Sequence, residues 1–285
     1  MTASRSPRRR AAALLITLAA LILVTASLTA LAVAATGAES ARRAATRAAI
    51  AEDVLLASDA LVADWLRRDG ARASVPLASA EPRVDVTRSE LTLADHPVTL
   101  VITAWDQQGM VPIEVGRSGS PLRLTLPAEA KRAIDQLVAD RIPEPYGLDQ
   151  IAAMASNPVF PDAHSPPAKA AAIGAIVATH TGGGSHATIN VNTAPLPLLE
   201  AALREAGAGG LDAILAARAE DRPARIGAIG LERTGRDRAV TLTDASSSWA
   251  IRTDVTIGPR RCSWWSVWQR RSGAWRLVQR MEIAQ

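Results

Sequence analysis

The chain has 285 residues, of which 48% are hydrophobic and 21% charged, enough for one sizeable core or two small ones. Its net charge is +4, but residues 1–10 contain four arginines and no acid, so the remainder is close to neutral and gives no reason to expect a nucleic-acid surface. Cys262 is the only cysteine, which excludes an intrachain disulfide and a cysteine metal cluster; we expect it to be buried.

A membrane-spanning helix is predicted near the N-terminus. Residues 11–35 are 25 uncharged positions, more than the roughly 20 that an apolar helix needs to cross the hydrocarbon core. Arginines precede this segment, and the next one is Arg42. The positive-inside rule therefore predicts that residues 1–10 are a cytoplasmic basic leader and that the C-terminal part lies outside the cytoplasm. The alternative is a secretory signal peptide cleaved after Ala32 or Ala34.

The predicted helix continues beyond the membrane segment, because no proline follows before Pro76. In residues 36–68 apolar side chains recur at helical spacing in two adjacent rows, which predicts an amphipathic continuation packed on the protein's own sheet. The whole helix would run from about Ala11 to Arg68, on the order of 85 Å at 1.5 Å per residue. Gly70 is expected to cap its C-terminus. The two rows are Val54, Leu61 and Trp65, and Leu55, Val62 and Leu66.

Extended segments are predicted on both sides of the chain's centre. Residues 71–97 are expected to be a loop with short extended pieces, and the β-branched segment Val98–Ala104 a strand. A turn over 105–109 and an extended run over 111–115 should follow. The C-terminal part predicts a three-stranded antiparallel meander, with Trp249, Ile251, Thr253, Val255 and Ile257 on one face; its strands are 249–257, 263–270 and 275–282. Trp264, Trp265 and Trp268 in it would pack in the core or, alternatively, form a stacking platform for a sugar or base.

Residues 116–239 are predicted to be mostly helical. Apolar side chains share one face of Ala128–Ala139, and Thr193 is a candidate N-cap with Pro195 just inside a helix that ends near Glu205. Residues 157–167 should be a loop, 181–185 a flexible glycine run and 188–191 a short extended piece. The further predicted helices are 149–155, 168–179 and 211–219.

This order of elements resembles the plan of a type IV pilin-like subunit. The segment Ala104–Gly109 resembles the aspartate-x-x-glycine turn after a central strand in the K-type minor pseudopilins of type II secretion systems (GspK), here Asp106 and Gly109. Ile189-Asn190-Val191-Asn192-Thr193-Ala194-Pro195 resembles that family's most recognisable motif. Ala213–Arg218 and Ser247-Ser248-Trp249 also resemble the corresponding segments of that family.

The resemblance implies an α+β, type IV pilin-like fold: a long N-terminal helix packed on an antiparallel sheet, with a large α-helical insertion. The sheet domain would comprise 69–115 and 240–285, and the insertion 116–239. The protein would be a single-pass protein of the bacterial inner membrane, with its C-terminal domain in the periplasm. It would be no enzyme, and would help to start and cap a pseudopilus at its tip.

The resemblance also implies partners: other minor pseudopilins, the inner-membrane secretion assembly, the lipid bilayer and, if the leader is processed, a prepilin peptidase. The leader would be cleaved between Arg10 and Ala11. Family members usually have a glycine there, whereas the first glycine of this chain is Gly37. If Ala11 is the first mature residue, the fifth is Leu15 where most pilin-like subunits have a glutamate, and an apolar residue there suits a subunit with no neighbour ahead.

Four alternatives stay open. The asparagine motif also resembles membrane-anchored helix-hairpin-helix DNA receptors of competence, although residues 188–238 are neutral overall, and DNA affinity relies on uncompensated positive charge. The same motif could act only as a helix-capping turn that satisfies backbone groups. His180 and His186 could be a metal pair, but solvent-exposed loop histidines are favoured and no cofactor is expected. Calcium stays an open alternative at Asp140, Glu144, Asp149 and Asp162, which form no compact ligand series.

Overall fold

The computed structural model describes residues 7–76, 79, 81–116, 119–139, 177–178, 187–228 and 240–283. Several predictions therefore lie outside the described residues: the helix at 149–155, the loop at 157–167, the glycine run, both candidate histidines and the candidate calcium ligands. The chain divides into two compact units, Met1–Glu52 and Asp53–Gln285.

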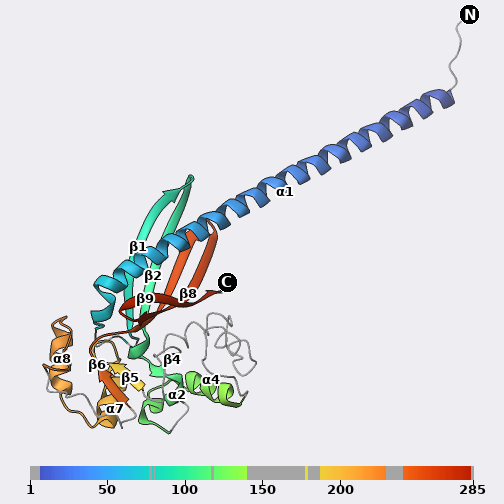
Figure 1. The fold of residues 1–285 in the computed structure, drawn as a ribbon. Helices are drawn as coiled ribbons and strands as arrows, with labels where there is room; N and C mark the ends of the chain where they lie inside the picture. The colour runs from blue at the N-terminus through green and yellow to red at the C-terminus, as the bar shows by residue number, and fades with distance from the viewer. Residues whose placement is uncertain are drawn as a thin grey trace, which may run out of the picture. The chain divides into compact units, whose positions relative to one another are not determined.

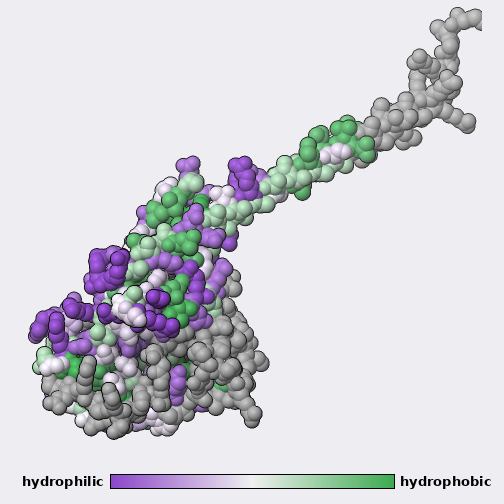
Figure 2. All heavy atoms as spheres, in the orientation of Figure 1, coloured by the Kyte–Doolittle hydropathy of each residue, from purple (hydrophilic) through white to green (hydrophobic). Residues whose placement is uncertain are grey.

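The first unit is one helix. Helix α1 extends over Pro7–Arg68, so it begins four residues before the expected start and ends where predicted (Figure 1). Its large apolar side chains from Leu21 to Val33 are exposed wherever the structure describes them, whereas Ile50 near the end of this unit is buried. Figure 2 shows mostly apolar surface along the described part of the helix that precedes the charged residues. The part from Leu23 onward contains a window that is long and apolar enough to cross a membrane. The exposed side chains are Leu21, Leu23, Val24, Leu28, Leu31 and Val33.

In the second unit, the end of α1 packs on a sheet. The Trp65 ring meets the Trp249 ring edge-on, with centroids 5.0 Å apart, and Asp59 forms an ion pair with Arg280. The prediction for Leu61 is wrong, because this side chain is 50% exposed. The face that meets the sheet is centred between the two predicted rows and leaves Leu61 at its edge. The buried side chains are Val54, Leu55, Ser58, Val62, Trp65 and Leu66.

Gly70 does not cap the helix. It begins a short 3-10 turn, η1 (Gly70–Arg72), and is buried. A Cβ at this position would lie 2.9 Å from Leu66 Cδ2 and 3.3 Å from Trp65 Cζ3, so glycine allows these side chains to pack closely, and its backbone is not left-handed.

The sheet has five antiparallel strands in the order β1-β2-β7-β8-β9. The predicted meander is confirmed, and the five residues placed on one face of its first strand are buried. The expected loop over 71–97 is wrong, since an eleven-residue strand occupies Arg83–Leu93. The second strand also includes Trp105 and Asp106, which were assigned to the turn. The strands are β1 (Arg83–Leu93), β2 (His96–Asp106), β7 (Ser248–Ile257), β8 (Arg260–Arg271) and β9 (Ala274–Ile283).

The part between β2 and β7 contains helices and two parallel strand pairs. The helices over 128–139 and 211–219 and the extended piece at 188–191 are confirmed within a residue or so. Two predictions are wrong: Val177–Ala178 is a strand, and only Val111–Pro112 of 111–115 is extended. Short segments such as these take their conformation from a distant pairing partner, which local periodicity cannot reveal. The elements are η2 (Gln107–Gly109), β3 (Val111–Pro112), α2 (Ile113–Gly116), α3 (Pro121–Leu124), α4 (Ala128–Ala139), β4 (Val177–Ala178), β5 (Ala187–Asn190), α7 (Leu196–Ala206), α8 (Leu211–Ala219) and β6 (Val240–Thr243).

Apolar side chains of these elements form one core. Strand β5 pairs with β6, β3 pairs with β4, and helices α4, α7 and α8 contribute to the same cluster. Its fully buried members include Leu122, Ile134, Leu137, Leu199 and Ile214. A smaller cluster under the sheet contains Trp105 and Trp265, whose rings lie 5.0 Å apart. Trp265 and Trp268 are therefore packing residues, as favoured from the sequence, and Cys262 is buried as expected.

Candidate functional site

The most unusual site in the described residues is a buried polar junction around Asp106, at the end of β2. Its carboxylate is fully buried and accepts four hydrogen bonds. Oδ1 accepts from the backbone N–H of Gln108 at 2.9 Å and from the Ser246 hydroxyl. Oδ2 accepts from Asn190 Nδ2 at 2.7 Å and from Thr193 Oγ1 at 2.6 Å. One carboxylate thus joins the end of β2, the turn after β5 and the segment before β7.

Burial raises the pKa of Asp106 above its ordinary value, because the charged form loses its hydration. The hydrogen bonds from Ser246, Thr193, Gln108 and Asn190 act in the opposite direction, since they stabilise the carboxylate. No salt bridge reaches this carboxylate from the described residues. The group is therefore held by neutral donors alone.

The turn after Asp106 requires glycine at its last position. A Cβ on Gly109 would lie 2.5 Å from Pro82 Cβ and 2.8 Å from Thr193 Oγ1, and carbon atoms do not approach so closely. Gln108, in the same turn, accepts a 2.7 Å hydrogen bond from the backbone N–H of Ser247 through Oε1. The aspartate-x-x-glycine segment is therefore a connector that binds two other parts of the chain.

The asparagine motif forms the other side of the junction. Asn190 Oδ1 accepts from the backbone N–H of Asn192. Asn192 in turn donates from Nδ2 to the carbonyl oxygens of Ala224 and Asp244, both at 3.0 Å, and accepts from Ala224 N at 2.8 Å. The expectation that these side chains satisfy backbone groups is confirmed. Thr193 is not the N-cap that was predicted: its hydroxyl is committed to Asp106, and Pro195 occupies the N-cap of α7 without a side-chain bond.

Arg218, on α8, holds the same turn from another direction. Its guanidinium is almost fully buried and donates to three carbonyl oxygens: Val75 at 2.6 Å, Ala194 at 2.7 Å and Val191 at 3.4 Å. Burial lowers the pKa of Arg218 to about 10, so it stays charged at neutral pH. A cation that binds only main-chain carbonyls acts as a clamp between α8 and the turn.

The chain that follows α1 passes through this junction. Ala71 O accepts from Ser246 N, and Val75 N donates to Asn192 O, each at 3.0 Å. Trp249 Nε1 donates to Gly70 O at 3.0 Å. The end of α1, the sheet and the helical part therefore meet at a single hydrogen-bonded node.

The structure brings together most of the residues that the motifs singled out. Asp106, Asn190, Asn192 and Thr193 are connected by the hydrogen bonds described above, and Gly109 packs closely against Thr193. The apolar motif residues Ile189, Val191 and Ala194 are buried in the adjacent core. Arg10 and Ala11 lie in α1, and cleavage between them stays a prediction.

The sequence analysis did not identify Ser246 or the role of Arg218. The only local signal for Ser246 was the run of serines before Trp249. Arg218 carried no signal beyond its place in a helix that resembles the family, because its partners are main-chain carbonyls.

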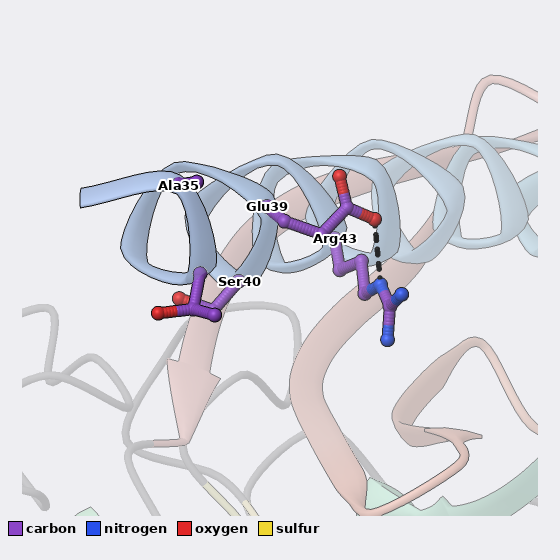
Figure 3. Close-up of a pocket in the computed structure, with 5 residues that line it drawn as sticks. Ala35, Glu39, Ser40 and Arg43 are labelled. Atoms are coloured by element: carbon purple, nitrogen blue, oxygen red, sulfur yellow. Dashed lines mark hydrogen bonds and ion pairs between the residues drawn. The ribbon is translucent and has the colours of Figure 1, made fainter. Parts of the chain in front are cut away.

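The junction is closed to substrates, since its carboxylate and its guanidinium are both buried and fully engaged. In the described ranges no three His, Cys, Asp or Glu side chains gather as a metal site would require. An open hollow lies on α1 of the first unit, where Figure 3 shows Ala35, Glu39, Ser40 and Arg43 on successive turns. Arg43 Nε pairs there with Glu39 Oε1 at 2.8 Å, and the Ser40 hydroxyl donates to the Gly37 carbonyl oxygen at 2.8 Å. The hollow thus has one exposed ion pair and a serine that is bonded within its own helix.

Comparisons with known proteins show a similarity to solved structures. No protein-family model matches the chain, and no curated protein matches it. Among solved structures, it is similar to a chain of the crystal structure of the GspK-GspI-GspJ complex from the type 2 secretion system of enterotoxigenic Escherichia coli. The sequence identity is 15% and the TM-score 0.46, and the match covers 87% of this chain and 100% of the other. A likeness of this degree assigns no function by itself.

Proposed function

We propose that this protein is a membrane-anchored pilin-like subunit that works by assembly: a minor pseudopilin at the tip of a type II secretion pseudopilus, which helps to initiate and cap it during protein export. The contrast along α1 carries the proposal. Leu23 and Leu31 are 70% and 67% exposed, whereas Leu66 near the other end is fully buried under the sheet. An uncovered apolar stripe of this length is not stable in water, so lipid or other apolar helices cover it.

The buried junction supports an assembly role. Its charged groups bind only other parts of the same chain, which makes the second unit one tightly connected body. We call this second unit, Asp53–Gln285, the head. A tightly connected head that follows an apolar helix suits a subunit that transmits or blocks contacts, and it offers no reaction centre among the described residues. The proposal therefore includes no catalysis and no cofactor, with calcium as an untested addition.

Position and partners follow from the same proposal. The chain would cross the bacterial inner membrane once, with the head in the periplasm. Its partners would be other minor pseudopilins, the inner-membrane secretion assembly, the bilayer and, if the leader is cut between Arg10 and Ala11, a prepilin peptidase.

The burial of Asn190, Asn192 and Thr193 speaks against the DNA-receptor alternative, because these side chains cannot reach a phosphate.

Arginine substitutions in the apolar stripe test the proposal. Ala26 and Ala30 lie in the exposed part of α1, where small residues allow close helix contacts in lipid. Ala26→Arg or Ala30→Arg should leave the head folded but abolish co-purification with partner pseudopilins and stop secretion. Ala216→Arg, at an exposed alanine of α8, is the matched control and should change neither. Normal co-purification and secretion by both stripe variants would contradict the proposal.

A further inference from the structure

We propose that the tip of the β8–β9 hairpin is a docking surface for an acidic segment of a partner protein. The basic tip consists of Arg270, Arg271, Trp275 and Arg276, which lie next to the turn that connects these strands. This inference goes beyond the proposed assembly role and does not depend on it.

The charge of this region is not balanced locally. Residues 248–283 contain seven arginines and two acids, whereas the chain beyond residue 10 is neutral as a whole. Arg252 and Arg261 both pair with Asp254, and Arg280 pairs with Asp59. These arginines have internal partners and need no external one.

The arginines of the basic tip have no such partner. Within the described part of the chain, no carboxylate pairs with Arg270, Arg271 or Arg276. Arg271 donates only to the neutral Oε1 of Gln269, at 2.8 and 3.1 Å. All three side chains are exposed. Among the described residues these three guanidinium groups are therefore available to bind an anion.

The hairpin geometry presents these groups in a defined arrangement. Ser272 and Gly273 have φ values of 51° and 83°, and positive φ at both central residues is the pattern of a type I′ turn, which suits the strand twist. Arg270 is directly opposite Trp275 in the ladder, and Gln269 is opposite Arg276. Because side chains alternate along a strand, Arg271 and Arg276 share one face and Arg270 and Trp275 the other.

An acidic protein segment fits this surface better than a nucleic acid does. A guanidinium binds a carboxylate through two parallel hydrogen bonds. Tryptophan and arginine are also the residues on which protein–protein binding energy concentrates, whereas nucleic-acid affinity builds up over many phosphate contacts. Arg270 shares one face of the hairpin with the partly exposed indole of Trp275, and Arg271 and Arg276 add two cations on the other face. An extended peptide that crosses the end of the hairpin, with carboxylates and an apolar side chain, can therefore contact all four side chains.

Binding of a defined peptide tests the proposal. The full-length protein in detergent micelles is titrated into a fluorescein-labelled peptide of repeated Glu-Glu-Leu triplets, and anisotropy is followed. The double variant Arg271→Gln/Arg276→Gln should bind at least about tenfold more weakly. Arg204→Gln/Arg225→Gln, which removes the same charge from two exposed arginines elsewhere, should bind within about twofold of the wild type.

Trp275→Ala separates a docking surface from general electrostatic attraction. This substitution leaves the charge unchanged, yet it should also lower the affinity for the peptide several-fold, because the indole contributes contact area. Equal affinities of the two double variants, or an unchanged affinity of Trp275→Ala, would overturn the proposal. So would tighter binding of a duplex DNA that is lost in Arg271→Gln/Arg276→Gln, since the surface would then recognise phosphates.

Discussion

Asn190 Nδ2 donates a 2.7 Å hydrogen bond to the carboxylate of Asp106, although 84 positions separate the two residues in the chain. The bond links the end of a sheet strand to the end of a strand in the helical part. Thr193 and Ser246 bind the same carboxylate, so removal of this single group would disconnect three segments. The predictions below follow from this connection and from the packing of α1.

Gly109→Ala should destabilise the head by about 1–3 kcal/mol, because the new methyl group would collide with Pro82 and with the Thr193 hydroxyl. Gly209→Ala is the control: nothing lies within 4 Å of its Cβ position, so the change should be near neutral. Urea denaturation of both variants measures the difference. Equal midpoints for the two variants would show that the turn relaxes freely and is no tight connector.

Asp106 should make the stability of the head depend on pH. Because the pKa of the buried carboxyl is raised, the folded state binds its proton more tightly than the unfolded state, whose pKa is about 3.9. Stability contributed by the protonated form is therefore lost as the pH rises from about 4 through the folded-state pKa.

Asp106→Asn removes this titration, and the comparison isolates its effect. The stability of the wild type relative to Asp106→Asn should fall as the pH rises, as measured by chemical denaturation at several pH values. The variant itself should lose about 1–3 kcal/mol at pH 4, because its amide NH2 faces the donor Asn190. A relative stability of the wild type that increases with pH would show that the four donors outweigh burial.

The same substitution should have a large effect on stability at one leucine of α1 and almost none at another. Leu66→Asp should prevent folding of the head, since it places an unpaired charge in a fully buried position. Leu61→Asp should change stability by less than about 0.5 kcal/mol, because that side chain is half exposed. Circular dichroism during thermal unfolding distinguishes them. Loss of structure in Leu61→Asp would mean that this face is covered.

Arg218→Met should destabilise the head by about 2 kcal/mol or more, because it leaves buried carbonyl oxygens of Val75 and Ala194 without their donor. Amide hydrogen exchange should increase first in the turn after β5 and in α8. Arg222→Met, at an exposed arginine four residues further on, should have little effect. Similar amide exchange in both variants would show that Arg218 does not hold α8 and the turn together.

The orientation of the chain gives a direct test of the charge asymmetry. With four arginines before the apolar segment, a reporter that is active only in the periplasm should be active when fused after Gln285. A reporter that requires the cytoplasm should be inactive at the same position. The reverse pattern would contradict the proposed location of the head.

The sequence by itself determined the elements whose signal is local. The apolar run and its amphipathic continuation predicted α1, and the alternation from Trp249 to Ile257 predicted the first strand of the meander, because each pattern repeats within one element. The motif residues Asp106, Gly109 and Asn192 also stood out before any contact was known. That they lie together was not predicted, because the contacts join residues 84 or more positions apart.

The tertiary structure decided what depends on a distant partner. Strand β1 and the two residues Val177–Ala178 are extended because other strands pair with them, and Leu61 is exposed because the sheet meets a neighbouring face of the helix. Thr193 binds Asp106 instead of capping α7, since a buried carboxylate must be satisfied and the hydroxyl is within reach. A periodic pattern shows which face of an element is apolar, whereas only the folded chain shows what that face touches.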